Sequence, residues 1–488
     1  MPRLPRTLLA LGVALGACTS IATAPDALAP DPQESHPSAA VGPTPAREPL
    51  VIALHATRPP IDLSTARAEQ LIAGTIDDWS LLDEPAARLR VIAAPNILTD
   101  MRAVTGTRLL AGPSVERAAS GTTAIARVRE DPNAVAVVPG SAIGPGVRAA
   151  TIDGIDPVRD PARAPLTIAG LRPGAVTTIM FVGDIMLARR VGARIDATGD
   201  RAFPMRLIAE QLAAADLTVG NVESTFARLG PPTQGDAFAA DPRAVEGLML
   251  AGFDVVSLAN NHVGDFGPAS LVETLRVLEE AGIDTFGAGE DRGGARRPAI
   301  VERNGIRVAF LGFNAIGETP PPGRDRPGAV RLRMQPRLGP LNDADLARMA
   351  ADVEAATRRA DVVIVMPHWG AQYTHRIHPD QRTVARAMIR AGADAVIGGH
   401  PHWVQGFELS RGAPIVYSLG NFVFDMDFMR KTQEGIGVEV VLWGDRVKAI
   451  EPIPVRIDDD FRPRFLSSDE GTSILDDVFA SSRAPWRR

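Results

Sequence analysis

Cysteine is nearly absent from this chain of 488 residues, because Cys18 is the only one. A single cysteine excludes an intrachain disulfide and also excludes a metal site built on cysteine thiolates. Any metal ion that the chain binds is therefore expected on nitrogen and oxygen ligands.

Lysine is almost as scarce, since Lys431 and Lys448 are the only two among 52 lysines and arginines. The net charge of −6 provides no positive field for nucleic acid, which we therefore exclude as a partner. Long hydrophobic runs are also missing beyond the N-terminus, so no later segment is predicted to span a membrane. Apolar residues make up 45% of the chain and charged residues 23%, as in an ordinary globular protein.

The N-terminus has the pattern of an export signal, with Arg3 and Arg6 placed before an apolar run over residues 8–17. That run is too short to be a mature membrane span. The next letters, "LGAC", resemble a bacterial lipobox, which implies cleavage before Cys18 and lipidation of its thiol. Thr19 follows the cysteine and favours the outer membrane, by resemblance to Gram-negative lipoproteins. The alternative is an ordinary secretory signal that happens to contain a cysteine.

Residues 1–18 are thus predicted to be a lipoprotein signal peptide, and residues 19–47 an Ala/Pro-rich tether that cannot bury enough apolar surface to fold. The expected location is the cell envelope, with a lipid anchor in the membrane and the protein facing the periplasm or the exterior.

A first folded region is predicted over residues 49–171. "PLVIALH" and "RLRVIAAP" have the composition of strands, and "STARAEQLIAG" indicates a helix between Ser64 as N-cap and Gly74. The segment "IDLSTARAEQLIAGTIDDWSLL" resembles the phosphate-binding periplasmic proteins of the type-2 solute-binding fold. About 120 residues are too few for two lobes, and no Thr-Ser-Gly phosphate loop is recognisable. We therefore expect a partial, single-lobe α/β domain.

After residue 176 the chain alternates apolar strands with helical stretches, which predicts α/β layering. Six apolar runs each end in a polar side chain that can bind metal. Because ligands bind at the carboxyl ends of strands in such folds, these side chains are expected on one rim. They are Asp184, Asn221 with Glu223, Asn261 with His262, His368, His400 with His402, and Asn421.

This set contains carboxylates, imidazoles and amide oxygens, which suit divalent cations. Two such ions about 3.5–4 Å apart can bind a phosphoryl oxygen and activate a water molecule. Each motif alone has an ordinary structural explanation, as a turn, a helix cap or a buried histidine. Their coincidence at six strand ends favours one shared metal site.

"FVGDIMLAR", "GNVEST", "LANNHVGDFG", "HWGAQY", "GGHPHWVQGFE" and "YSLGNFVFD" resemble, in order, the motifs of the CapA-type capsule and poly-γ-glutamate biosynthesis family. That family is similar to the calcineurin-like metallophosphoesterases. The resemblance implies a layered α/β–β–α fold over residues 176–457, which leaves residues 458–488 as a peripheral tail. It implies two divalent ions, with Mn, Fe, Zn and Mg not distinguished.

The resemblance also implies roles for single residues. His262 is expected to contact the substrate, with Asp265 orienting it or capping the next helix. Four side chains are expected behind the ligands or against the substrate: Asn221, Gln372, Asn421 and Asp425. The implied metal ligands are Asp184, Glu223 as a bridge, Asn261, His368, His400 and His402.

Two departures from the pattern matter. Met186 stands where the phosphoesterases have the histidine of Asp-x-His, so one ion has fewer ligands. Gln372 stands where the family often has Glu, which removes a possible base. Arg189 and Arg190 are expected on a solvated helix face.

Two classes of function remain open. The first is an envelope-anchored hydrolase that acts on a phosphoester, or on an amide or ester bond of an anionic polymer. The second is a non-catalytic component of capsule or export machinery that binds polymer and keeps a relic metal site. In both cases the expected partners are an anionic polymer or phosphorylated substrate, the membrane, and proteins of that machinery.

Overall fold

The computed structural model describes residues 46–94, 97, 115–171 and 173–487. The predicted signal peptide, Cys18 and nearly all of the predicted tether lie outside the described residues. Within the described ranges, no helix is both long enough and apolar enough to cross a bilayer. Pro45–Arg488 form one compact unit.

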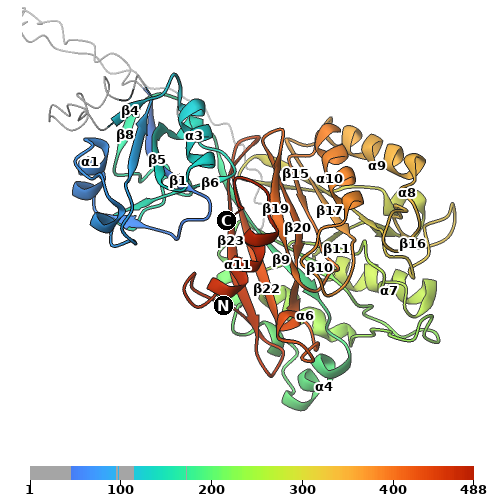
Figure 1. Ribbon diagram of the computed structural model, residues 1–488. Helices are drawn as coiled ribbons and strands as arrows, with labels where there is room; N and C mark the ends of the chain where they lie inside the picture. The colour runs from blue at the N-terminus through green and yellow to red at the C-terminus, as the bar shows by residue number, and fades with distance from the viewer. Residues whose placement is uncertain (1–45, 95–96, 98–114, 172, 488) are drawn as a thin grey trace, which may run out of the picture. The chain divides into compact units, whose positions relative to one another are not determined.

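Residues 47–169 supply a sheet in the order β4–β3–β5–β1–β6, with β8 also paired to β1 (Figure 1). Alternate residues of β1 enter two different cores, so both faces of this sheet are covered. The bounds are β1 Arg47–His55, β3 Arg90–Ala93, β4 Val115–Arg117, β5 Ala134–Pro139, β6 Val147–Ala149, β8 Thr167–Ala169, and helices α1 Thr65–Ile72 and α3 Gly121–Glu130. A short parallel pair, β2 Asp62–Leu63 and β7 Thr151–Ile152, lies outside it.

Helix α1 begins and ends where the sequence predicts. The hydroxyl of Ser64 accepts a hydrogen bond from the backbone N–H of Arg67, and this satisfies one of the free donors of the first turn. Gly74 follows the helix with φ of 72°, a conformation in which glycine carries no Cβ penalty.

The larger part of the chain contains two sheets. The first runs β12–β11–β10–β9–β22–β23–β24, with β21 also paired to β9. Its strands are β9 Val176–Ile185, β10 Leu217–Val222, β11 Val255–Ser257, β12 Asp284–Phe286, β21 Asn421–Val423, β22 Glu434–Trp443, β23 Arg446–Ile457 and β24 Pro463–Phe465. The second runs β14–β15–β17–β18–β20–β19. Its strands are β14 Ala299–Arg303, β15 Ile306–Asn314, β17 Val362–His368, β18 Ala395–Ile397, β19 Val404–Ser410 and β20 Ala413–Leu419.

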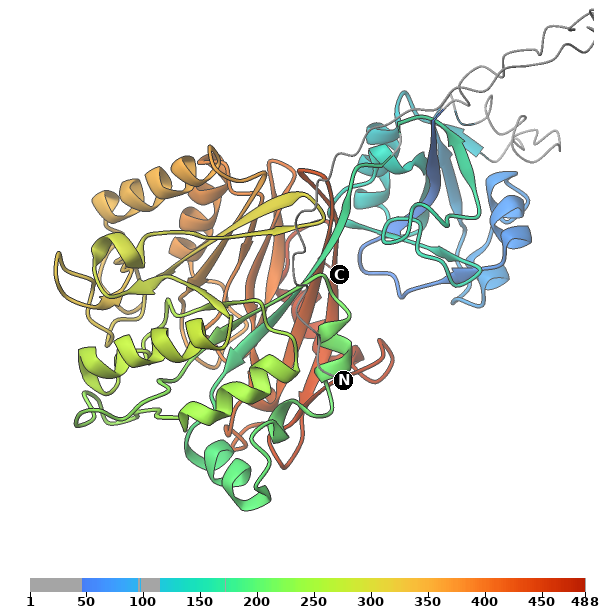
Figure 2. The same cartoon turned by 180° about the vertical axis from the view of Figure 1, so that it is seen from behind.

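The two sheets pack face to face, and helices cover their outer faces (Figures 1 and 2). On β9, Phe181 enters the core between the sheets, while Val182 enters the core beneath the helices, as the two-residue period of a strand requires. Helices α4 Arg189–Thr198, α5 Ala209–Ala213, α6 Val245–Leu250 and α7 Gly267–Glu280 cover the first sheet, and α9 Asp343–Ala356 and α10 Pro379–Arg390 cover the second. This α/β–β–α layering confirms the predicted fold class.

The C-terminal segment packs on the core, whereas its polar and proline-containing sequence predicts a peripheral tail. Helix α11, Thr472–Ser481, lies against β19. Ile474, Phe479 and Trp486 enter the core between the sheets, and Trp486 is 1% exposed. Each such side chain stabilises the fold by about 1.5–3 kcal/mol when fully buried, so this segment belongs to the folded unit.

Candidate metal centre

The parallel strands of both sheets end at a common edge. In the first sheet, β9 and β10 are parallel, and Asn221 lies opposite Asp184. In the second sheet, β15, β17, β18 and β20 are parallel, so that His368 and the turn after β18 leave from the same side. The two edges meet where Asn421 of β21 pairs with Asp184. The polar residues that follow six separate strands are thereby gathered together, as the sequence predicts.

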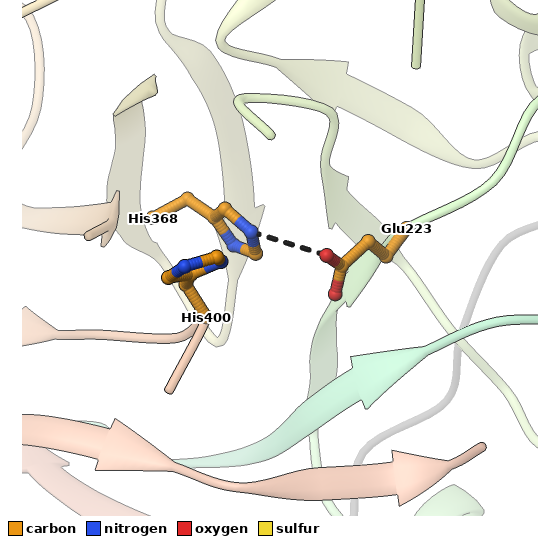
Figure 3. Close-up of side chains that lie close together, drawn as sticks. All are labelled: Glu223, His368 and His400. Atoms are coloured by element: carbon orange, nitrogen blue, oxygen red, sulfur yellow. Dashed lines mark ion pairs between the residues drawn. The ribbon is translucent and has the colours of Figure 1, made fainter. Parts of the chain in front are cut away.

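One cluster of ligand atoms forms around Glu223, His368 and His400 (Figure 3). The Nε2 atom of His368 lies 3.2 Å from Glu223 Oε1 and 2.9 Å from the amide oxygen of Asn261. The ring of His400 packs edge-on against that of His368, with 4.9 Å between centroids. All four side chains are at most 5% exposed. A carboxylate, an amide oxygen and two imidazoles therefore converge, a donor set that suits a divalent cation.

A second cluster, formed by Asp184, Glu223 and His402, shares Glu223 with the first. Asn421 donates from Nδ2 to the carbonyl of Thr432, so its Oδ1 accepts a hydrogen bond of 2.8 Å from Nδ1 of His402. This bond leaves Nε2 of His402 available as a ligand. Asn421 thus lies behind His402, which is one of the two positions expected for it.

The unsatisfied atoms in the two clusters fit a bound cation. Neither carboxylate oxygen of Glu223 and neither ring nitrogen of His400 has a hydrogen-bond partner, although all four atoms are buried. Leaving a buried polar group unpaired costs about 1–3 kcal/mol, and more for a charged group. A cation coordinated between these side chains would pair the oxygens of Glu223 and one ring nitrogen of His400, so these groups can hold a metal ion.

The backbone of the "GGHPH" turn is strained in order to bring its histidines to the site. His400 has φ of 95° and His402 has φ of 57°, in the left-handed region that non-glycine residues seldom adopt. Such conformations cost about 1–3 kcal/mol each and persist only where the surroundings impose them. Gly399 lies between Asp184 and His368, and a Cβ atom there would be 2.8 Å from Asp184 Oδ1.

Burial sets the protonation of the clusters. It raises the pKa of Asp184 to about 7, and the nearby charge of Glu223 adds to that increase. Burial also raises the pKa of Glu223. It lowers the pKa of His368 to about 4, that of His400 well below its usual value, and that of His402 as well. The imidazoles are therefore neutral at pH 7, as metal coordination requires.

His262 is held beside the clusters by a separate set of contacts. Its Nε2 atom lies 4.0 Å from Glu223 Oε1, and its Nδ1 donates a hydrogen bond of 2.8 Å to Asp265. Burial opposes its charge, but the hydrogen bond to Asp265 and the charge of Glu223 outweigh burial and raise the pKa of His262. Asp265 does not cap α7, where no side chain bonds to the first turn, so it orients His262 instead.

Phe238 completes the environment of His262 and has no motif in the sequence. The two rings stack with centroids 3.8 Å apart and planes inclined by 19°. The backbone N–H of Phe238 also donates to Asp265, at 2.7 Å. A phenylalanine from a loop is positioned here only by tertiary folding, so neither spacing nor composition could have indicated it.

Two buried asparagines connect the strand ends behind the ligands. Asn221, which the sequence places outside the ligand set, donates to Asp184 at 2.8 Å and lies 3.3 Å from Nδ1 of His368. Asn260, the first asparagine of "NNH", donates to the oxygen of Asn221 and accepts from the backbone of His262. Asn260 was not among the predicted site residues, although its place in the "NNH" motif could have indicated it.

The two departures from the family pattern lie in different surroundings. Met186 is fully buried, and its sulfur accepts a hydrogen bond from the backbone N–H of Ala188. Its side chain has no nitrogen, so it does not replace the histidine as a ligand. Gln372 is exposed in the loop after β17, so it does not lie behind the ligands, one of the two positions expected for it. The next residue, Tyr373, stacks on His402 instead, with centroids 6.2 Å apart.

Asp425 pairs with arginines rather than with the ligands, so of the two positions expected for it, behind the ligands or against the substrate, it does not take the first. Its carboxylate forms an ion pair with Arg189 and accepts a hydrogen bond from the backbone of Arg190. The guanidinium of Arg189 lies over the ring of Phe238, 4.5 Å from its centroid, and also binds Asp236. Arg189 is exposed at the start of α4, as the expectation of a solvated helix face has it, and it also contacts the ring of Phe238 beside His262.

Residues 178–426 match a protein family described as bacterial capsule synthesis protein PGA_cap. The chain is 32% identical over 286 residues to capsule biosynthesis protein CapA of Bacillus anthracis, a match covering 57% of this chain and 67% of that protein. It is 31% identical over 287 residues to PGA biosynthesis protein CapA of Bacillus subtilis, covering 58% and 72% respectively.

Among solved structures, the chain is similar to a hypothetical protein from Thermus thermophilus, at 19% identity and a TM-score of 0.35. That match covers 57% of this chain and 98% of the other.

Proposed function

Because the chain belongs to the PGA_cap family of bacterial capsule synthesis proteins, we propose that it is a metal-dependent hydrolase of capsule or poly-γ-glutamate biosynthesis. Its substrate is a phosphoester, or an amide or ester bond in the anionic polymer. The observation that carries this proposal is the pair of buried clusters that share Glu223. The oxygen and nitrogen atoms in them that have no hydrogen-bond partner are of the kinds that bind a divalent cation.

We infer that the centre holds two ions. Asn261, His368 and His400 would join Glu223 at one of them, and Asp184 and His402 would join it at the other. A divalent cation held here would polarise a phosphoryl or carbonyl oxygen and would activate water as a nucleophile. The second site has fewer protein ligands because Met186 supplies none.

His262 then has the position of a general acid. Asp265 fixes its Nδ1 proton, the stacked ring of Phe238 fixes its plane, and its Nε2 points towards Glu223. From this position it can donate a proton or a hydrogen bond to the oxygen that becomes negative in the reaction. Arg189 pairs with Asp425 and lies over the ring of Phe238, so it is placed to attract an anionic substrate.

The test measures metal content and turnover on the same preparations. The full chain is loaded with Mn²⁺, Zn²⁺ or Mg²⁺, and hydrolysis of a chromogenic phosphodiester and of poly-γ-glutamate is followed. His262→Ala is expected to lower turnover by about 10²–10⁴-fold, the usual contribution of general acid catalysis, while bound metal stays within error of wild type. Loss of metal in this variant, with turnover reduced only in proportion, would contradict the assignment of His262.

A non-catalytic role is the second candidate, and Met186 and the exposed Gln372 favour it. In this case the protein binds anionic polymer within capsule or export machinery, and the metal centre only stabilises the fold. Stoichiometric metal without turnover on phosphodiester, amide or ester substrates would support this role against the hydrolase.

The same proposal places the protein in the cell envelope, held to the membrane through lipidated Cys18. The support is the "LGAC" sequence that follows a short apolar run, together with the match to capsule synthesis proteins.

A further inference from the structure

A second candidate site lies away from the ligand clusters, in a cavity of about 510 Å³ beside the short helix α8, Arg292–Ala295, and the start of α9 (Figure 1). Strand β16, Gly328–Ala329, pairs with β13, Ala288–Gly289, next to it. The volume lies within the range of ligand-binding pockets. Six arginines line the cavity: Arg292, Arg296, Arg326, Arg331, Arg333 and Arg348.

The positive charge of this arginine cavity is only partly compensated. Asp345 forms ion pairs with Arg333 and Arg348, and Asp352 forms one with Arg296 at 2.7 Å. The other three lining arginines form no ion pair within the described part of the chain. Six guanidiniums and the single carboxylate of Asp345 line the cavity, with Asp352 paired to Arg296 and the charge of Glu318 acting on Arg331, so the lining keeps a positive balance in a protein whose net charge is −6.

Arg331 is the least satisfied member of the group. Its Nη2 donates to the carbonyl of Thr319 at 3.2 Å, but its Nε is buried without a hydrogen-bond partner. Burial lowers the pKa of its guanidinium, and the neighbouring charge of Arg333 lowers it further. An anion in the cavity would give Arg331 a partner and relieve the repulsion between the two guanidinium groups.

The wall of the arginine cavity connects directly to the metal centre. Arg331 forms an isolated β-bridge with Asn314 at the end of β15. The residues on either side of Arg331 exchange backbone hydrogen bonds with Asn314. Asn314 pairs in register with His368, and its side chain donates to the carbonyl of Asn260 at 3.1 Å. Neighbouring strands lie about 4.8 Å apart, so the backbone of Arg331 is two strand spacings, or roughly 10 Å, from that of His368.

We propose that the arginine cavity binds successive carboxylates of an extended anionic polymer and holds that chain beside the metal centre. Guanidinium groups bind carboxylates through two parallel hydrogen bonds, and several fixed guanidiniums match a ligand with repeated carboxylates. The choice of a polycarboxylate rests on the proposed function, whereas the charge and position of the cavity do not.

The experiment measures binding of fluorescein-labelled poly-γ-glutamate to the full chain by fluorescence anisotropy, with metal removed by EDTA. The test variant is Arg292→Glu/Arg326→Glu, because both side chains are exposed and line the cavity. The matched control is Arg297→Glu/Arg359→Glu, which makes the same change in net charge at exposed positions outside the cavity lining.

The test variant is expected to bind at least about tenfold more weakly than wild type, because two charge-assisted contacts are replaced by repulsion. The control is expected to stay within about twofold, and wild-type binding to weaken as salt is raised. Equal binding by all three proteins, or equal weakening in both variants, would overturn the proposal. Binding of polyphosphate with no binding of poly-γ-glutamate would overturn the assignment to carboxylates.

This result is separate from the test of hydrolysis. If wild type turns over no substrate but only the cavity variant loses the polymer, the hydrolase proposal fails and the polymer site holds. If wild type hydrolyses a small phosphodiester while polymer binding does not depend on the cavity, the hydrolase proposal holds and the polymer site fails. Metal content and thermal unfolding of both variants check that each is folded.

Discussion

Replacing Glu223 by glutamine should stabilise the metal-free protein and remove most of the stabilisation that bound metal gives. The glutamate is fully buried, and neither of its oxygens accepts a hydrogen bond. The imidazole of His368, 3.2 Å away, cannot neutralise it at pH 7.5, because burial holds the pKa of His368 at about 4. The unpaired charge therefore destabilises the metal-free protein by more than the about 1–3 kcal/mol that an unpaired neutral polar group costs, and the neutral amide removes the part that is due to the charge.

With metal this gain is offset. A ligand at 100 times its Kd stabilises a protein by about 2.7 kcal/mol. Loss of a side chain that only supports a ligand weakens metal affinity by up to about 100-fold. Loss of a ligand shared by both clusters should therefore weaken metal affinity by at least about 100-fold. At the same metal concentration, the stabilisation of Glu223→Gln would then fall to about 0.4 kcal/mol. For a cooperative unit as long as Pro45–Arg488, 1 kcal/mol corresponds to about 1 °C in Tm.

The assay is scanning calorimetry with and without added Mn²⁺, together with metal analysis. Glu408→Gln is a matched control, because Glu408 is also buried but accepts hydrogen bonds from Arg382, Arg386 and Tyr417. It should lower stability in both states and leave the metal response intact. A Glu223→Gln protein that is less stable without metal, or that keeps the wild-type metal response, would refute the reasoning.

Other changes test the anchor, a buried acid and the packing of the histidine turn. Cys18→Ser should move the protein from the membrane fraction to the soluble envelope fraction, and unchanged sedimentation with membranes would count against the lipid anchor. Burial raises the pKa of Asp394 to about 6, so the folded state binds this proton more tightly and stability is lost as pH rises from about 4 to about 6. Asp394→Asn, which keeps an acceptor for the N–H of Val363, should therefore gain about 3 kcal/mol at pH 7.5 and almost nothing at pH 4, as measured by urea unfolding. Gly399→Ala should lower bound metal by displacing Asp184, and full metal content in that variant would contradict the close packing of the turn.

The convergence of the side chains in the candidate metal centre could be predicted from sequence, because it depends on the order of residues along each strand. Apolar runs that end in Asp184, His368 and His400 identify strands and their exits, and parallel strands bring their exits to one edge. The alternation of strands and helices indicates the topology. The proximity of Asp184 and His400, which are 216 positions apart, could therefore be predicted without knowing any of their contacts. The N-cap at Ser64 was predictable for the same reason, since a cap acts within one turn.

Tertiary structure alone decided the rest. Phe238, Tyr373 and Arg189 reach the site from loops and a helix start whose direction depends on packing, and no period or motif encodes that direction. Gln372 lies in the loop after the strand that carries His368, but it is exposed. The conformation of that loop decides that the next residue, Tyr373, faces inward instead. The arginines of the cavity are scattered over residues 292–348, and they become a single charged site only when α8, β16 and α9 come together. The sequence therefore determined which groups leave the strand ends, whereas the packing of loops and helices decided which side chains surround them.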